Sequence, residues 1–171
     1  MNPHNIDAER AVLGAALTGP QMLDELTDLL QATDFYQPRH GAIWTAILDL
    51  HARGDRPDPM LVDKHLTGHR GIDLPYLHDL TTVETIAVPA QAPHYARLVR
   101  DAAVIRRLHE ATIAIRQRLE EASDADVAAE DSRGLLEAAL AGNAHTDAGI
   151  SVADLANATI DELGTDVDYG I

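Results

Sequence analysis

The feature of this sequence that most constrains its fold is a thirty-residue stretch, Ala92 to Glu121, which contains no glycine and only one proline, at its second position. Apolar residues recur along it at steps of three and four, the spacing of one face of an α-helix. Thirty residues at 1.5 Å each make a helix about 45 Å long, more than a small globule can cover. The stretch therefore predicts a helix that projects from the rest of the molecule.

A second helical stretch follows after a short break. Ser123 and Asp124 can cap a helix that runs to about residue 141, so residues 92–141 are predicted to form an antiparallel helical hairpin. Gly134 weakens the helix propensity of the second arm. A projecting hairpin cannot bury all of its apolar surface within itself, so a remaining stripe is predicted to mediate self-association. The stripe consists of Ile105, Leu108, Thr112, Ile115 and Leu119.

The residues before the hairpin are punctuated by proline and glycine between short helical patterns. Helices are expected over about 5–17, 21–30, 38–53, 59–66 and 74–80, and no stretch shows the alternation of a strand. The predicted fold is therefore all-α, with a helical globular subdomain of five or six helices over residues 1–91. Asp34-Phe35-Tyr36 is expected to be a loop whose two rings fill the core. The predicted core residues are Leu13, Phe35, Ile43, Trp44, Ile47 and Leu77.

Two further segments follow the hairpin. Residues 142–150 are polar and glycine-containing, which predicts a flexible linker. Ser151 and Asp154 can then cap a short amphipathic linker helix within residues 151–171. A helix this short is marginal on its own in water, so we expect it to dock on a partner or another subunit. The docking residues are predicted to be Val152, Leu155, Thr159 and Leu163.

The charge of the chain is distributed unevenly. The formal net charge is −15, and residues 120–171 hold 13 of the 28 acidic residues but only one of the 13 basic ones. Binding to a phosphate backbone needs clustered positive charge, so direct DNA binding as the main function is disfavoured. The acidic residues around the hairpin turn favour a solvated face, with electrostatic docking of a partner as the alternative. They are Glu120, Glu121, Asp124, Asp126, Glu130 and Asp131.

The sequence shows no sign of an active site. The pattern GxxxxGK[ST] is absent, since the single lysine, Lys64, has no glycine run before it. His65 and His69 could share one helix face, but Gly68 interrupts it, so solvated histidines are favoured over a metal pair. Asp55 and Asp58 are interpreted as turn and cap residues. We therefore predict no catalytic, cofactor-binding or metal residues, and a metal-dependent hydrolase is the weakest alternative.

Three features that the sequence lacks indicate the cellular compartment in which the protein is expected. The chain has no cysteine, which excludes a disulfide scaffold, a thiolate zinc site and a cysteine nucleophile. No apolar run has the length of a membrane span, and the N-terminus lacks the cationic-then-apolar order of a signal peptide. A cytoplasmic protein without membrane contact is expected.

Five short motifs occur in order along the chain. The first is Ala8-Glu9-Arg10-Ala11-Val12-Leu13-Gly14. The others are Asp34-Phe35-Tyr36 with Arg39-His40-Gly41-Ala42-Ile43-Trp44, Gly54-Asp55-Arg56-Pro57-Asp58, Tyr76-Leu77 with Leu80, and Tyr95-Ala96 with Val99-Arg100 and then Arg106. The ordered set resembles the N-terminal domain of DnaB-type replicative DNA helicases of bacteria or phages, and the first motif fits that family's A-E-x-A-V-L-G opening.

The resemblance implies a function that composition and spacing do not supply. In this family the hairpins pair, and six copies form a trimer-of-dimers collar that binds primase and, in some systems, a helicase loader. The short helix after the linker is implied to pack on a neighbouring subunit's motor domain. The parent protein would be an ATP-dependent DNA helicase of the primosome, with ATP and Mg²⁺ bound only in a motor domain beyond Ile171. DNA contact by this part would be weak or indirect. The alternative is a stand-alone helicase-interacting regulator or another protein-interaction module.

Overall fold

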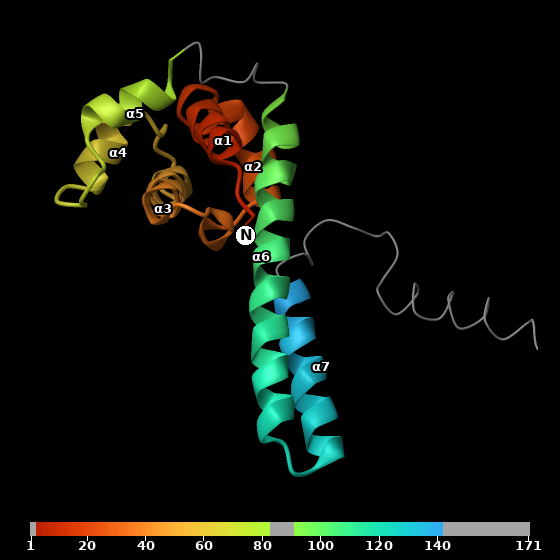
Figure 1. The fold of residues 1–171 in the computed structure, drawn as a ribbon. Coiled ribbons are helices and arrows are strands. Elements are labelled where there is room, and N and C mark those ends of the chain that lie inside the picture. The colour runs from red at the N-terminus through yellow and green to blue at the C-terminus, as the bar shows by residue number, and fades with distance from the viewer. Residues whose placement is uncertain (1–2, 83–90, 142–171) are drawn as a thin grey trace, which may run out of the picture.

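The computed structural model describes residues 3–82 and 91–141, which form α-helices and two short 3-10 helices but no strand (Figure 1). The predicted all-α class, a helical globule followed by a long antiparallel hairpin, is confirmed. The predicted linker, 142–150, and linker helix, 151–171, lie outside the described residues. In chain order the elements are α1 (Ile6–Thr18), η1 (Pro20–Met22), α2 (Leu23–Leu29), η2 (Ala32–Asp34), α3 (Pro38–Ala52), α4 (Pro59–His65), α5 (Leu74–Leu80), α6 (Ala92–Glu121) and α7 (Ala125–Ala141).

Local capping signals explain where several of these helices begin. The side chains of Asn5, Asp58 and Asp73 each accept a backbone N–H from the first turn of α1, α4 and α5. Such a bond satisfies one of the four N–H groups that a helix start leaves unpaired. Proline occupies an early position of α3, α4 and α5, where its missing N–H costs nothing. Asp58 is therefore a cap, as expected from the sequence.

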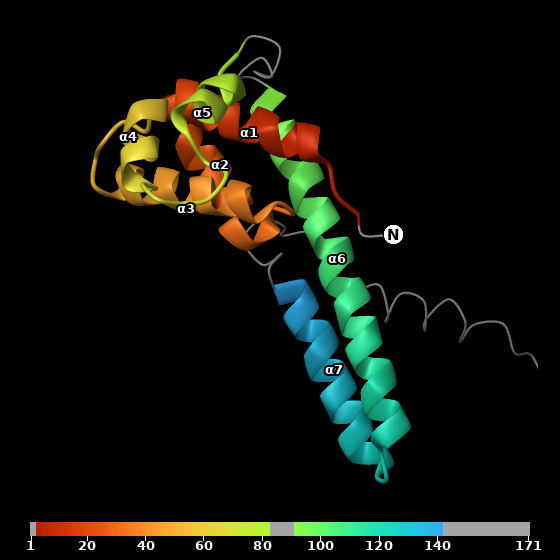
Figure 2. The same ribbon diagram turned by 60° about the vertical axis from the view of Figure 1, so that its left-hand side comes forward.

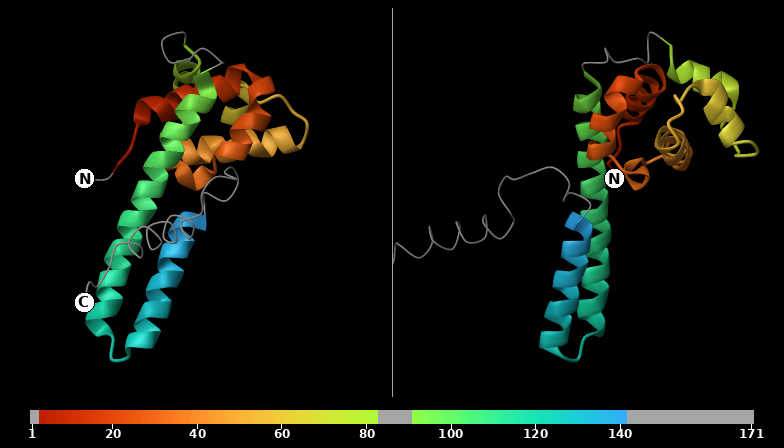
Figure 3. Two further views of the ribbon diagram at one scale, coloured as in Figure 1. Left: turned by 90° about the vertical axis from the view of Figure 1, so that its right-hand side faces the viewer. Right: turned by 180° about the vertical axis from the view of Figure 1, so that it is seen from behind.

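The helices form a globule from which a two-helix arm extends. α1 and α2 lie against the first half of α6, α3 lies below α1 in this view, and the α4–α5 pair lies on the side of the globule away from α6 (Figure 1). A view turned by 60° shows α7 running beside the second half of α6, away from the globule (Figure 2). The side and back views show the same arm (Figure 3). One helix, α6, therefore belongs to both parts.

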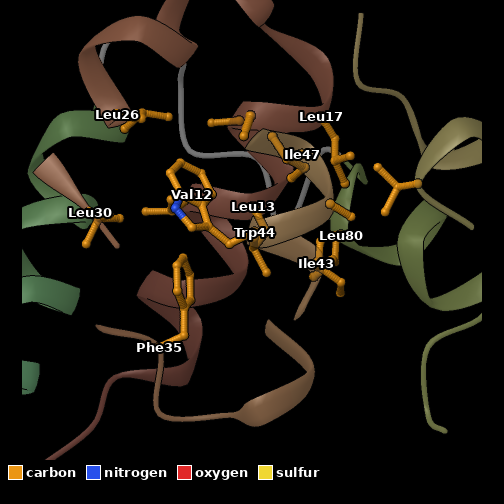
Figure 4. Close-up of a cluster of buried hydrophobic side chains, with 14 of the residues drawn as sticks. Val12, Leu13, Leu17, Leu26, Leu30, Phe35, Ile43, Trp44, Ile47 and Leu80 are labelled. Carbon is orange, nitrogen blue, oxygen red and sulfur yellow. The ribbon is translucent and has the colours of Figure 1, made fainter. Parts of the chain in front are cut away.

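The hydrophobic core lies between α1, α2, α3, α4, α5 and the first turns of α6. Trp44 is completely buried, and Phe35 packs against it with ring centroids 5.6 Å apart (Figure 4). All six residues predicted for the core are buried. Ala92, Ala96 and Val99 of α6 belong to the same core, so it extends across the predicted boundary at residue 91. The small alanines let α6 approach closely, and the globule therefore holds the base of the arm.

The prediction that both rings of the Phe35-Tyr36 pair fill the core is wrong for Tyr36. Phe35 is buried, whereas Tyr36 is 38% exposed and its ring stacks on His4, with centroids 4.4 Å apart. Phe35 has extended backbone angles, and successive side chains of an extended segment point in opposite directions. Only one of the two rings can therefore point inward.

Candidate protein-interaction surface

The two arms of the hairpin are joined by small residues. Ala111 of α6 and Ala128 and Ala139 of α7 are buried between the helices. Side chains this small bring the helices together but cover little of the surface around them. The larger apolar residues of the arms are therefore left at the edges of the contact or outside it.

The predicted self-association stripe lies along α6 beside this contact. Leu108 and Ile115 are half-buried, whereas Ile105, Thr112 and Leu119 are exposed, with Leu119 reaching 56%. Nothing in the described residues covers the three exposed side chains. Val127 and Leu136 of α7 are exposed as well, and so is Ile113, which lies on a different side of α6 from Leu119. Several exposed large apolar side chains on one arm are typical of a surface that binds another protein.

The tip of the hairpin is acidic, but half of its acids are paired. Arg118 contacts Asp131 at 3.1 Å, Arg133 contacts Glu130 at 2.5 Å and Arg116 lies 3.9 Å from Glu120. These pairs are mostly exposed, so each contributes little to stability. Asp124 caps α7 by accepting the N–H groups of Asp126 and Val127. A shallow cavity of about 350 Å³ lies beside the turn, lined by Arg118, Glu121, Ala122, Ser123, Asp124, Val127, Ala128 and Asp131.

Two consecutive arginines fasten the arm to the globule. Arg106, nearly buried, donates to the backbone oxygens of Asp34 at 2.6 Å and Pro3 at 3.1 Å. Arg107 forms an ion pair with the buried carboxylate of Asp34 at 2.8 Å and donates from Nε to the carbonyl of Ala139 at 3.2 Å. That carbonyl belongs to the last turn of α7, where carbonyls have no helical partner. Arg107 therefore links α6, α7 and the loop before α3.

Arg106 differs from the arginines of α6 that form ion pairs. Arg107, Arg116 and Arg118 each contact a carboxylate. Arg106 instead binds two backbone oxygens and lies over the ring of Tyr36, with Cζ 5.6 Å from the centroid. No sequence signal indicated this, because its partners are 72 and 103 residues away.

A buried polar network inside the globule was also missed. Glu9 accepts the N–H of Tyr36 at 2.7 Å and contacts Nδ1 of His40 at 2.6 Å, and Nε2 of His40 lies 2.6 Å from the Tyr76 hydroxyl. Glu9 also accepts the N–H of Tyr36, so Nδ1 is the nitrogen of His40 that donates a proton toward the carboxylate. Burial raises the pKa of Tyr76, which keeps its hydroxyl in the donating form. Glu9 and His40 occupy motif positions of the sequence, but only the structure shows that they touch.

The described residues contain no group of three or more His, Cys, Asp and Glu side chains that could hold a metal ion. His65 contacts Asp49 at 3.3 Å, and His69 is exposed on the turn that follows α4. Over 3–82 and 91–141, no helix combines the length and apolar character needed to cross a bilayer.

The described residues form a helical globule with a projecting two-helix arm, on which several large apolar side chains are exposed. A family model, the DnaB-like helicase N terminal domain, matches residues 1–101. The chain is 36% identical over 132 residues to the replicative DNA helicase DnaB of Mycobacterium leprae, covering 74% of this chain and 21% of that protein. It is 37% identical over 110 residues to the DnaB of Treponema pallidum, covering 62% of this chain and 25% of that protein.

Solved structures show the same fold. The N-terminal domain of DnaB helicase from Mycobacterium tuberculosis superposes with a TM-score of 0.73 at 30% identity, covering 80% of this chain and 99% of that one. A DnaB-like replicative helicase, described with its interactions with primase, superposes with a TM-score of 0.68 at 19% identity over 97% of this chain and 38% of its own. The chain belongs to the DnaB-like helicase N-terminal domain family. It spans about a fifth to a quarter of the length of the DnaB relatives it matches.

Proposed function

We propose that this chain is the N-terminal collar module of a hexameric replicative DNA helicase, which self-associates through its hairpin and docks primase during DNA replication. The observation that carries the proposal is the open apolar stripe of α6, from Ile105 to Leu119, on an arm fixed to the globule by Arg106 and Arg107. A rigid arm with an uncovered apolar face suits pairing with a second arm of the same kind, in a dimer or a trimer of dimers.

The remaining parts of the proposal rest on family membership. Primase, and in some systems a loader, is proposed as a partner of the collar, and ATP and Mg²⁺ as ligands of a separate motor domain. The docking residues of the linker helix, Val152, Leu155, Thr159 and Leu163, are proposed to contact a neighbouring motor domain. The net charge of −15 supports a collar that acts through protein contacts, with weak or indirect contact to DNA and none to membranes.

The test of self-association is size-exclusion chromatography with light scattering over a range of concentrations. Leu119→Asp with Ile105→Asp should weaken association at least about tenfold, because burying an unpaired carboxylate costs more than the 1.4 kcal/mol that a factor of ten represents. Both residues are exposed, so the hairpin should fold without them. Leu108→Asp with Ile115→Asp extends the test to the half-buried part of the stripe.

The matched control is Ile113→Asp. Ile113 is 52% exposed on the same helix but lies about 120° around it from Leu119. It should leave association unchanged. A wild-type chain that stays monomeric at every concentration, or a control that dissociates the oligomer as strongly, would show that the interface lies elsewhere. Titration calorimetry with the same organism's primase tests docking, and an absence of binding heat at oligomer-forming concentrations would remove primase from the proposal.

A further inference from the structure

A half-buried arginine at the start of α3 is held in one orientation, while its terminal nitrogens contact no partner within residues 3–82 and 91–141. The guanidinium of Arg39 lies over the ring of Tyr76, with Cζ 4.2 Å from the centroid, and its Nε donates to Oε1 of Gln37 at 2.7 Å. Neither contact involves the two terminal NH₂ groups. None of the ion pairs within the described residues includes Arg39. The two terminal NH₂ groups of Arg39, which form the fork of the guanidinium, are therefore oriented and can bind a ligand.

The platform beneath Arg39 is fixed by the buried network. The Tyr76 hydroxyl bonds to His40, which bonds to Glu9, and the rings of His40 and Tyr76 are parallel to within 9°. Displacement of the Tyr76 side chain would break its hydrogen bond to His40, which is completely buried. Arg39 therefore loses little conformational freedom when a ligand binds, which favours binding.

Other arginines of the described residues do not combine a fixed orientation with the lack of a carboxylate partner. Arg10, Arg107 and Arg118 are paired with carboxylates. Arg53 and Arg70 are exposed, and no contact within the described residues orients them. Arg39 is both oriented and unpaired, the state in which a guanidinium recognises a planar anion through two parallel hydrogen bonds.

The charges around Tyr76 indicate how much negative charge a ligand of Arg39 should carry. Two cations, Arg10 and Arg39, and two anions, Asp79 and Glu9, act electrostatically on Tyr76. Arg10 is paired with Asp79 at 2.6 Å, and Glu9 is buried. Of the two cations, Arg10 therefore has a contacting carboxylate, whereas no carboxylate of the described residues contacts Arg39, which leaves room for one carboxylate of a ligand. A nucleic-acid backbone needs several clustered cations, which this site does not offer.

We propose that Arg39, supported by Tyr76, is a recognition site for one carboxylate presented by a protein partner, either an Asp or Glu side chain or a chain terminus. The two terminal nitrogens of Arg39 bind the two oxygens of that carboxylate. The site lies on the globule, on residues separate from the hairpin stripe, and its existence does not depend on the proposed function.

The test is nuclear magnetic resonance of the full, isotope-labelled chain. The probe is the blocked tripeptide acetyl-Gly-Glu-Gly-amide, with acetyl-Gly-Gln-Gly-amide as its neutral counterpart. The glutamate peptide should shift the Arg39 Nε–H resonance and the amides at the start of α3 saturably, and the glutamine peptide should not. Arg39→Lys keeps the charge but loses the fork, so it should weaken binding about tenfold.

Three variants separate recognition from folding and from general charge. Arg39→Ala should abolish the shift while circular dichroism shows an unchanged fold. Arg70→Ala, which removes an unoriented arginine, should bind the glutamate peptide like the wild type. Tyr76→Phe keeps the ring but not the bond to His40, and should show intermediate affinity.

Three results would overturn the proposal. Equal shifts with both peptides would show that no carboxylate is recognised. Equal affinity of Arg39→Lys and the wild type would show that the fork is not used. Displacement of the glutamate peptide by equimolar oligothymidylate in an Arg39-dependent manner would assign the site to nucleic acid instead.

Discussion

Glu9 connects α1 to three residues of one segment that lies 27 to 31 positions later in the sequence. Its carboxylate accepts the backbone N–H of Tyr36, reaches that of Gln37 at 3.4 Å and contacts the ring of His40, while it is only 1% exposed itself. The two N–H groups lie just before and at the cap of α3, where the positive end of the helix dipole favours an anion. A buried carboxylate surrounded by donors in this way holds the loop before α3 in place.

The first prediction concerns this carboxylate. Glu9→Gln should lower the free energy of unfolding by about 3 kcal/mol, because an amide can accept fewer bonds and turns its own NH₂ toward donors. Thermal unfolding followed by circular dichroism measures the loss. Asp79→Asn, which removes the carboxylate of the exposed Arg10 pair, is the matched control and should cost less than about 1 kcal/mol. Equal effects of the two variants would contradict a special role for the buried network.

For individual residues, the sequence predicted the buried apolar positions well and the buried polar contacts poorly. Leu13, Ile43, Trp44 and Ile47 follow a helical period, and all are buried. Glu9 and His40 have no such signal, because a buried polar residue looks the same in the sequence as an exposed one. Their burial depends on partners 27 to 36 residues away, which only the fold brings together.

The helices could be placed from local signals. α6 occupies residues 92–121 as expected, and α7 starts next to its predicted cap, Asp124. Proline, glycine and capping residues act over a few positions, so they are visible without knowledge of the tertiary structure. The direction of the arm has no local signal, since it depends on Arg106 and Arg107 binding to Asp34.

The second prediction concerns the end of α7. Arg107→Ala should leave the buried carboxylate of Asp34 without its ionic partner and the carbonyl of Ala139 without its donor. We expect a loss of about 2–3 kcal/mol in unfolding free energy and faster hydrogen exchange in the last turn of α7. Exchange measured by mass spectrometry resolves that turn from the rest of the arm.

The control for this variant lies at the other end of the hairpin. Arg118→Ala removes an exposed pair with Asp131 and should change stability by less than about 1 kcal/mol. Its effect on exchange should be confined to the tip. If the last turn of α7 keeps its protection from hydrogen exchange in Arg107→Ala, apolar packing alone holds the arm in place.

For the whole molecule, the uneven charge has a physical consequence for self-association. The chain carries a net charge of −15, and the acidic residues from Glu120 to Asp131 lie around the hairpin tip of each copy. If the arms pair as proposed, with their tips side by side, these like charges come closer together. Electrostatic repulsion between copies then opposes the proposed association, which apolar burial favours.

The third prediction follows from this opposition. The dissociation constant of the oligomer should fall several-fold between 10 mM and 150 mM salt at pH 7, because the screening length shrinks from about 30 Å to about 8 Å. Analytical ultracentrifugation measures it. Glu120→Gln, Glu121→Gln and Asp126→Asn together should tighten association at low salt and flatten the salt dependence. As a control, Asp7→Asn, Glu25→Gln and Asp28→Asn together remove three exposed charges from the globule. This triple variant should change the dissociation constant less than the triple variant at the tip does. Association that weakens with salt would mean that ion pairs between copies, rather than apolar contact, dominate the interface.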